Sequence, residues 1–162
     1  MDNWDISFYP HAFDWAFTIV HDADDAYSYR LAPITDKFNQ YGIKASFTAF
    51  AFWDPKHKSS NFAAFEKKSK IGPKCVPLEH PPELKYYRSL VDQGHEVGLH
   101  TASDGHDTAL IVEKAFEFYR QAFGFYPPLY IEHRDNLQNM QQLGANPSSE
   151  YFMIDLLNRY AP

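Results

Sequence analysis

Apolar and polar positions alternate along this chain in two periods, one typical of strands and one typical of helices. Short runs rich in apolar and β-branched residues predict strands at residues 15–21, 43–52, 95–100 and 128–133. Segments with helical periodicity follow at residues 30–42, 81–94, 107–124, 136–144 and 148–160. This order is typical of parallel βα repeats and predicts an α/β fold whose sheet is open or curved into part of a barrel.

Proline and glycine mark several ends of the predicted helices. Pro33 is expected in the first turn of the first helix, where its missing N–H costs nothing, and Gly42 is expected to end that helix. Gly124 is expected to end the third helix. The last segment, 148–160, predicts a helix with a serine cap, with a strand over 151–155 as the alternative.

A lysine-rich stretch separates the second predicted strand from the helix that follows it. Residues 53–80 hold six of the ten lysines and are long for a connection inside a compact domain. We interpret the stretch as an insertion or a functional loop with a solvated surface, in preference to an anion-binding surface. The whole chain, residues 1–162, is the size of a single domain.

Composition and charge narrow the class of protein. The net charge of −6 argues against nucleic-acid binding, which needs a basic face. A single cysteine, Cys75, excludes an intrachain disulfide framework. The first residues lack the pattern of a secretion signal, and no apolar run approaches the roughly 20 residues that span a bilayer, so we expect a cytoplasmic protein that does not enter a membrane.

Residues suited to metal binding or acid–base chemistry follow three of the four predicted strands. His21 and Asp22 end the first strand, His100 ends the third, and His133 and Arg134 end the fourth. In parallel α/β sheets, ligands bind at the carboxyl ends of the strands. We therefore expect these three clusters to converge on one edge of the sheet.

The first and third of these strand ends predict a metal site. Asp22 and Asp24 lie on the same side of an extended chain, so one carboxylate can bind a metal while the other accepts a proton from water. Asp25 would follow as a ligand or a helix cap. His100 and His106 would add two imidazoles, and three protein ligands leave the open position of a catalytic site. Zinc is the expected ion.

The fourth strand end and nearby aromatic residues predict substrate contacts. Arg134 would hold a carboxylate in place or bind an anionic group. His133 would touch the substrate or simply end its strand. Tyr27 and Trp53 would line a groove for a sugar ring.

Three motifs resemble those of the NodB-type polysaccharide deacetylases. They are TIVHDADD, YGIKASFTAF and LVDQGHEVGLHT, and the resemblance covers residues 15–135. It implies that one aspartate is the catalytic base and the next a metal ligand, either Asp22 with Asp24, the pair that we favour, or Asp24 with Asp25. It also implies that His100 is the first metal histidine.

The chain departs from the family pattern at several positions. Asp104 stands where the family has its second metal histidine, so either His106 or Asp104 is expected to complete the ligand set. Arg134 resembles the family's arginine that positions the catalytic aspartate, although the usual Arg-x-Pro-Tyr run is absent. No late Leu-x-His motif, which supplies the family's general acid, precedes Pro162. The resemblance therefore implies an incomplete or distorted (β/α) barrel.

The function that the resemblance implies is that of a metal-dependent hydrolase. It would remove acetyl groups from N-acetylated sugars, with a divalent metal as cofactor, an aspartate as general base and a carbohydrate as partner. The chain would be one deacetylase-like domain or the N-terminal part of one. Two alternatives stay open: a non-catalytic binding or scaffold domain of the same type, and another metal-dependent hydrolase that acts on amides or phosphoesters.

Overall fold

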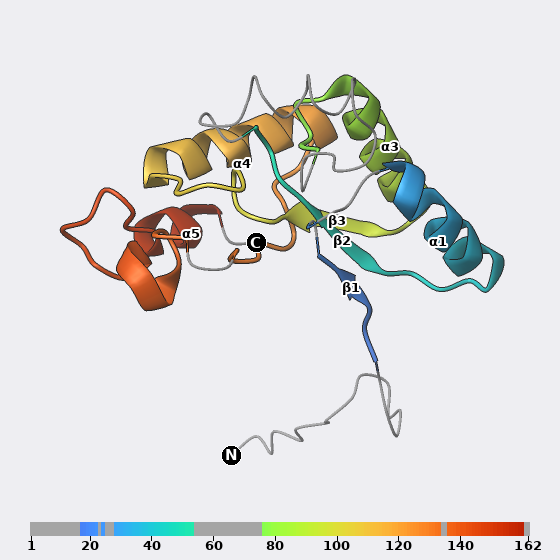
Figure 1. The fold of residues 1–162 in the computed structure, drawn as a ribbon, viewed down its shortest axis with the longest axis horizontal. Coiled ribbons are helices and arrows are strands. Elements are labelled where there is room, and N and C mark those ends of the chain that lie inside the picture. The colour runs from blue at the N-terminus through green and yellow to red at the C-terminus, as the bar shows by residue number, and fades with distance from the viewer. Residues whose placement is uncertain (1–16, 23, 25–27, 54–75, 134–135, 161–162) are drawn as a thin grey trace, which may run out of the picture.

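The computed structural model describes residues 17–22, 24, 28–53, 76–133 and 136–160. At its centre lies a parallel three-stranded sheet with the strand order β1–β2–β3 (Figure 1). The strands are β1 (Val20–His21), β2 (Ser46–Ala49) and β3 (Glu96–Leu99). The prediction of a mixed α/β fold with a parallel sheet is confirmed.

The continuous apolar runs of the two longer strands reflect burial. Phe47 and Ala49 of β2 and Val97 and Leu99 of β3 are almost completely buried. They belong to one core cluster together with apolar residues of the helices. Parallel strands that are covered on both faces read as apolar runs and not as an alternation, which is the pattern seen here.

The predicted fourth strand makes a single bridge to the sheet. Tyr130 pairs in parallel with Leu99. The Leu99 N–H donates to the Leu129 carbonyl at 2.8 Å, and the Ile131 N–H donates to the Leu99 carbonyl at 2.9 Å. A Cβ atom at Gly98 would lie 2.5 Å from the Leu129 carbonyl oxygen, so glycine is what permits this close approach. The segment lies where it was predicted but is too short for a strand.

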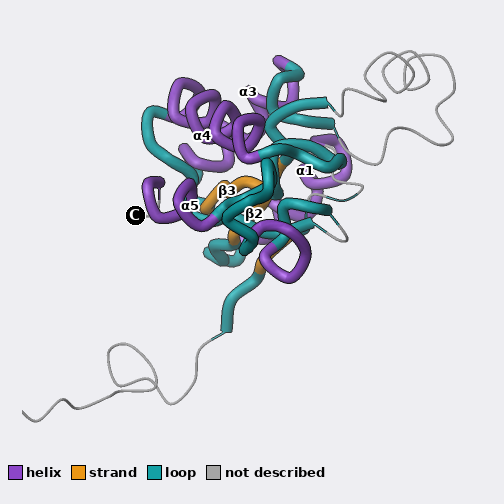
Figure 2. The backbone as a smooth tube through the Cα atoms, turned by 90° about the vertical axis from the view of Figure 1, so that its left-hand side faces the viewer, coloured by secondary structure: helices purple, strands orange, loops and turns teal. Residues whose placement is uncertain are grey.

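Within the described residues, four α-helices accompany the sheet: α1 (Ser28–Gln40), α3 (Pro81–Asp92), α4 (Ala109–Phe123) and α5 (Ile154–Tyr160). Helices α1 and α3 contact each other, as do α4 and α5 (Figures 1 and 2). Helix α4 ends at Gly124, as predicted, with a left-handed φ of 87°. No helix in the described ranges is both long and apolar enough to cross a membrane.

Helix α1 begins earlier than predicted, at Ser28, so Pro33 lies in its second turn and not in its first. Glu83 of α3 explains the early start. Its carboxylate accepts hydrogen bonds from the Ser28 N–H at 3.0 Å and the Ser28 hydroxyl at 2.8 Å. A carboxylate at a helix N-terminus satisfies an N–H that has no partner inside the helix, and this offsets the cost of an internal proline.

The helix predicted at residues 136–144 is wrong except for its last turn. Only η2 (Met140–Gly144) is helical, and Gln142 within it has non-helical backbone angles. The side chain of Asn139 instead donates to the His133 carbonyl at 3.3 Å. Asparagine side chains that bond to the backbone compete with helix formation, which the apolar periodicity does not register.

The last helix is shorter than predicted, starting at Ile154, and the alternative strand is not formed. The Ser148 N–H donates to Asn146 Oδ1 at 3.0 Å, and the Tyr151 N–H donates to Ser149 Oγ at 3.1 Å. These turns, closed by polar side chains, take the place of the expected first helical turns.

Most of the lysine-rich insertion, residues 54–75, lies outside the described residues. The chain resumes beside β2, where the Leu78 N–H donates to the Phe50 carbonyl at 2.8 Å. The Glu79 N–H donates to the Ala51 carbonyl at 2.9 Å. The insertion therefore returns to the carboxyl end of β2, next to the edge where the predicted functional residues lie.

Candidate metal centre

Asp24, His100 and His133 meet at the carboxyl edge of the sheet. Each offers one ligand atom, and these atoms lie within 4.8 Å of one another. His133 Nε2 lies 3.1 Å from Asp24 Oδ1. The two histidine side chains are 2% and 4% exposed, whereas Asp24 is 35% exposed. We call these three residues the metal centre because they form a candidate ligand set for an ion.

His100 is held by the strand that precedes it. It follows β3 directly, and its N–H donates to the Ala49 carbonyl of β2 at 3.0 Å. The next residue, Thr101, has a φ of 61°, a left-handed conformation that is rare for a β-branched side chain. Its hydroxyl donates to the Ser103 carbonyl at 2.8 Å. Such backbone costs about 1–3 kcal/mol and is found where the surroundings enforce it, often at functional sites.

His133 is held by the segment that pairs with β3 and by the polar turn after it. The His133 carbonyl accepts the Asn136 N–H at 3.2 Å and the Asn139 side-chain amide at 3.3 Å. The Tyr130 bridge sets where this segment lies relative to β3. His133 therefore depends on contacts between distant parts of the sequence.

Phe50 fixes the orientation of both imidazole rings. Its buried ring lies edge-on to His100 at 5.1 Å and to His133 at 5.2 Å, measured between ring centroids. The two imidazoles are 5.0 Å apart. Edge-to-face contacts of this kind favour a defined ring geometry, so the histidines are oriented by packing.

The aspartates come from a more exposed part of the chain. Asp22 Oδ1 accepts the Asp24 N–H at 2.9 Å, which closes a tight turn after β1. The same oxygen lies 3.4 Å from His100 Nε2, and the Asp22 side chain is 64% exposed. Asp22 therefore faces the metal centre from the solvent side.

The electrostatics of the centre favour a neutral His100. Burial lowers the pKa of His100, although the nearby carboxylates of Asp22, Asp24 and Asp104 oppose this. Among the described residues, neither ring nitrogen of His100 nor of His133 has a hydrogen-bond partner. Buried nitrogens without a partner are costly. Two imidazole nitrogens beside a carboxylate are a donor set that suits zinc and similar ions.

The structure brings together only part of the predicted site. Asp24 and His100 are in the centre, Asp22 is beside it, and His133, predicted to touch substrate, is within it. His106 is not brought to the centre, because it is exposed and its Nδ1 accepts the Leu137 N–H at 3.2 Å.

The remaining predicted residues are not part of the described centre. The backbone N–H of Trp53 donates to Glu79 Oε1 at 2.7 Å. Tyr27, Asp25 and Arg134 lie outside the described residues. The sequence analysis assigned His133 to substrate and not to this Asp/His/His group, although its place at the end of the segment next to β3 was the available signal.

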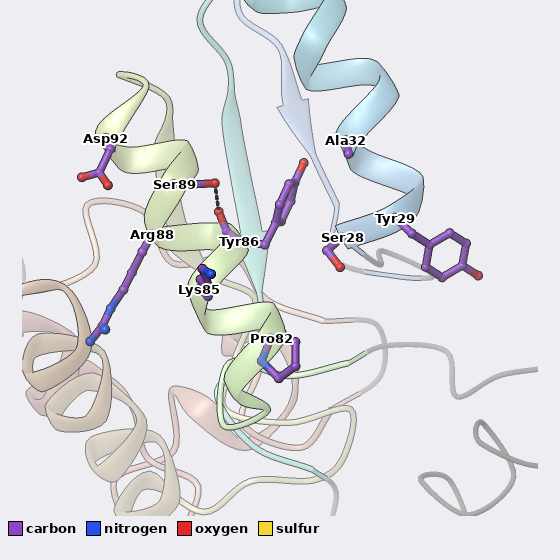
Figure 3. Close-up of a pocket in the computed structure, with 9 residues that line it drawn as sticks. All are labelled: Ser28, Tyr29, Ala32, Pro82, Lys85, Tyr86, Arg88, Ser89 and Asp92. Carbon is purple, nitrogen blue, oxygen red and sulfur yellow. Dashed lines mark hydrogen bonds between the residues drawn. The ribbon is translucent and has the colours of Figure 1, made fainter.

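A separate groove lies between α1 and α3 (Figure 3). Tyr86 of α3 projects toward α1, where its hydroxyl is 3.0 Å from the Thr35 hydroxyl. Ser89 donates to the Tyr86 carbonyl at 2.6 Å. No residue that lines the groove belongs to the metal centre, so the two features are distinct.

Comparisons with known proteins identify no relative. No protein-family model matches the chain, no curated protein matches it, and no solved structure matches it. The fold and the site thus define a mixed α/β protein with a parallel sheet and an Asp/His/His group at the carboxyl ends of its strands. The similarity to the deacetylases rests on the sequence motifs alone.

Proposed function

We propose that this chain is a metal-dependent hydrolase that removes acetyl groups from N-acetylated sugars. The observation that carries the proposal is the pair of buried histidines, whose ring nitrogens have no hydrogen-bond partner among the described residues and lie beside the Asp24 carboxylate. We infer likewise that the sheet belongs to an incomplete or distorted (β/α) barrel, since its strands follow βα order.

Asp24, His100 and His133 would hold the ion, with zinc the expected one. A bound divalent metal would supply Lewis acidity, polarising the acetyl carbonyl and lowering the pKa of water. Three protein ligands from three segments suit a catalytic site, because they leave a position open. Burial of both imidazoles excludes water from their side of the centre.

Asp22 is the residue best placed to accept a proton. Its carboxylate is largely exposed and lies 3.4 Å from His100 Nε2, at the open side of the centre. The turn through the Asp24 N–H fixes its position relative to the ligand Asp24. This arrangement supports the pair of Asp22 as base and Asp24 as ligand, and it keeps base and ligand close without burying both charges.

A non-catalytic role is favoured by a different feature of the same residues. His133 lies between two carboxylates, with Nε2 3.1 Å from Asp24 and Nδ1 3.5 Å from Asp104. A protonated His133 would satisfy both carboxylates without any metal. In that case the centre would be a structural ion-pair cluster.

Zinc binding separates these two functions. The chain would be treated with a chelator and titrated with zinc by calorimetry. We expect one zinc per chain, lost in Asp24→Ala, His100→Ala and His133→Ala. His106→Ala is the matched control and should bind zinc as the native chain does. A native chain that binds no zinc would favour the structural cluster.

Acetate release then tests the reaction. The zinc-loaded chain should release acetate from N-acetylglucosamine oligomers. Asp22→Asn keeps an oxygen for the Asp24 N–H and should still bind zinc, while acetate release falls by about 10²–10⁴-fold, the usual contribution of a general base. Zinc binding without acetate release would contradict the sugar substrate and favour another amide or a phosphoester.

A further inference from the structure

We propose that Asp104 is a positioning residue that fixes which nitrogen of His133 binds the metal. This inference rests on the proposed metal centre. His133 lies between two carboxylates. Nε2 faces the ligand Asp24 at 3.1 Å, and Nδ1 faces Asp104 Oδ1 at 3.5 Å.

A histidine ligand needs a defined tautomer. A neutral imidazole binds a metal through one nitrogen and carries its proton on the other, and the acceptor beside that second nitrogen decides which is which. With Asp104 beside Nδ1, the proton stays on Nδ1 and the Nε2 lone pair faces Asp24. At 3.5 Å the Asp104 carboxylate makes no hydrogen bond to Nδ1, and it favours a proton there through its negative charge.

The loop that carries Asp104 is held in place from within. Asp107, which is buried, accepts the Ser103 N–H at 2.8 Å and the Ser103 hydroxyl at 2.7 Å. The Thr101 hydroxyl donates to the Ser103 carbonyl. These bonds set the backbone immediately before Asp104 and so direct its carboxylate to His133.

The burial of the two partners fits this role. Asp104 is 31% exposed, whereas His133 is 4% exposed. The carboxylate thus keeps much of its hydration while it orients a ring that has little access to water. Removing the charge from Asp104 should therefore leave the fold intact and act on His133.

This role of Asp104 accounts for the departure of the chain from the deacetylase motif. Asp104 occupies the position where that motif has a metal histidine. In this chain the second imidazole comes from His133, and Asp104 faces the Nδ1 atom of that ring.

Zinc affinity, measured by competition with a chromophoric chelator, tests the proposal. Residues that contact the second ring nitrogen of a metal-bound histidine typically contribute about 10–100-fold to metal affinity. We therefore expect Asp104→Ala to weaken zinc binding by that factor. Asp104→Asn keeps an oxygen acceptor and should lose less. Asp36→Asn removes an exposed carboxylate from α1 and is the matched control.

Nitrogen-15 NMR of the histidine rings gives a readout that a merely structural role would not change. In the zinc-loaded native chain, His133 should show Nε2 bound and Nδ1 protonated, and in Asp104→Ala the ring should show both tautomers. If Asp104→Ala binds zinc like Asp36→Asn while His133→Ala does not bind it, this inference is overturned and the metal centre stands. A native chain that binds no zinc overturns both.

Discussion

The two sides of the metal centre are built differently. The histidine side, His100 and His133, is buried, packed against Phe50 and attached to the sheet by backbone hydrogen bonds. The aspartate side, Asp22 and Asp24, follows a strand of two residues and is far more exposed. The histidine side is therefore held in place by the core, whereas the aspartate side is held by a turn.

This difference allows the histidines to be oriented by burial while the carboxylates stay hydrated and charged. Neutral imidazoles can be buried at moderate cost, and burial orients them before any ligand arrives. Carboxylates are far more costly to bury, so keeping them near water preserves their charge. A site made in this way combines oriented neutral donors with hydrated charges.

The largest effect is expected from the contact that supports the histidine side. In Gly98→Ala the new methyl group would collide with the Leu129 carbonyl, and the segment that carries His133 would have to move. We expect a loss of about 2–3 kcal/mol in the free energy of unfolding, measured with urea, and weaker zinc binding.

The matched comparison for this change is Gly124→Ala, where an added Cβ meets nothing within 4 Å but the left-handed φ is strained. It should cost about 1 kcal/mol through backbone strain and leave zinc binding unchanged. Equal effects of the two substitutions on zinc affinity would contradict the role of the Gly98 contact in placing His133.

A smaller effect is expected from the anchor of α1, the helix that follows the aspartates along the chain. Glu83 accepts two hydrogen bonds from Ser28, the first residue of the helix after the aspartates. Glu83→Gln replaces one acceptor oxygen with a donor and should cost about 1–2 kcal/mol of stability. Zinc binding should change less than in Gly98→Ala.

A double-mutant cycle isolates this anchor. Ser28→Ala removes the hydroxyl, and the coupling energy between Glu83→Gln and Ser28→Ala follows from urea unfolding of the two single variants and the double variant. Strictly additive effects would show that the contact contributes nothing of its own.

The smallest effect on the free energy of unfolding is expected from His95, which lies at the opposite end of β3. Its Nδ1 accepts the Ala45 N–H at 3.3 Å, and burial, together with Lys44, lowers its pKa. A lowered histidine pKa stabilises the fold fully above the unfolded value of about 6.5. This contribution is lost as the pH falls below 6.5 through the folded pKa.

His95→Asn keeps an acceptor without titrating, so it serves as the reference for the pH dependence. The difference in unfolding free energy between the native chain and His95→Asn should be constant above about pH 6.5 and shrink in acid. Because His100 titrates in both proteins, its contribution cancels. A difference that does not vary with pH would argue against this hydrogen bond.

The sequence allowed prediction of a parallel sheet with a cluster of polar residues at one edge. The apolar runs ending in Asp22, His100 and His133 placed these residues at strand ends, and the structure groups them there. The loop after His100 could not be predicted in this way. Its course depends on the left-handed Thr101 and on the buried Asp107, which only the folded chain reveals.

The same limit explains the place of His106. Its spacing from His100 predicted that His106 is a metal ligand, but the loop directs its side chain to the Leu137 N–H. His133 is far from His100 in sequence and close to it in space, because the segment before it pairs with Leu99. Patterns in the sequence predict contacts between residues that are close along the chain better than contacts between distant segments.

The bridge between Leu99 and Tyr130 joins two segments that are synthesised at different times. Asp24 and His100 leave the ribosome before His133, so a growing chain holds two members of the centre while the third is still missing. The centre is completed only when the segment around Tyr130 docks beside β3. Zinc capture by ribosome-bound chains of increasing length would therefore mark the moment at which this last long-range contact forms.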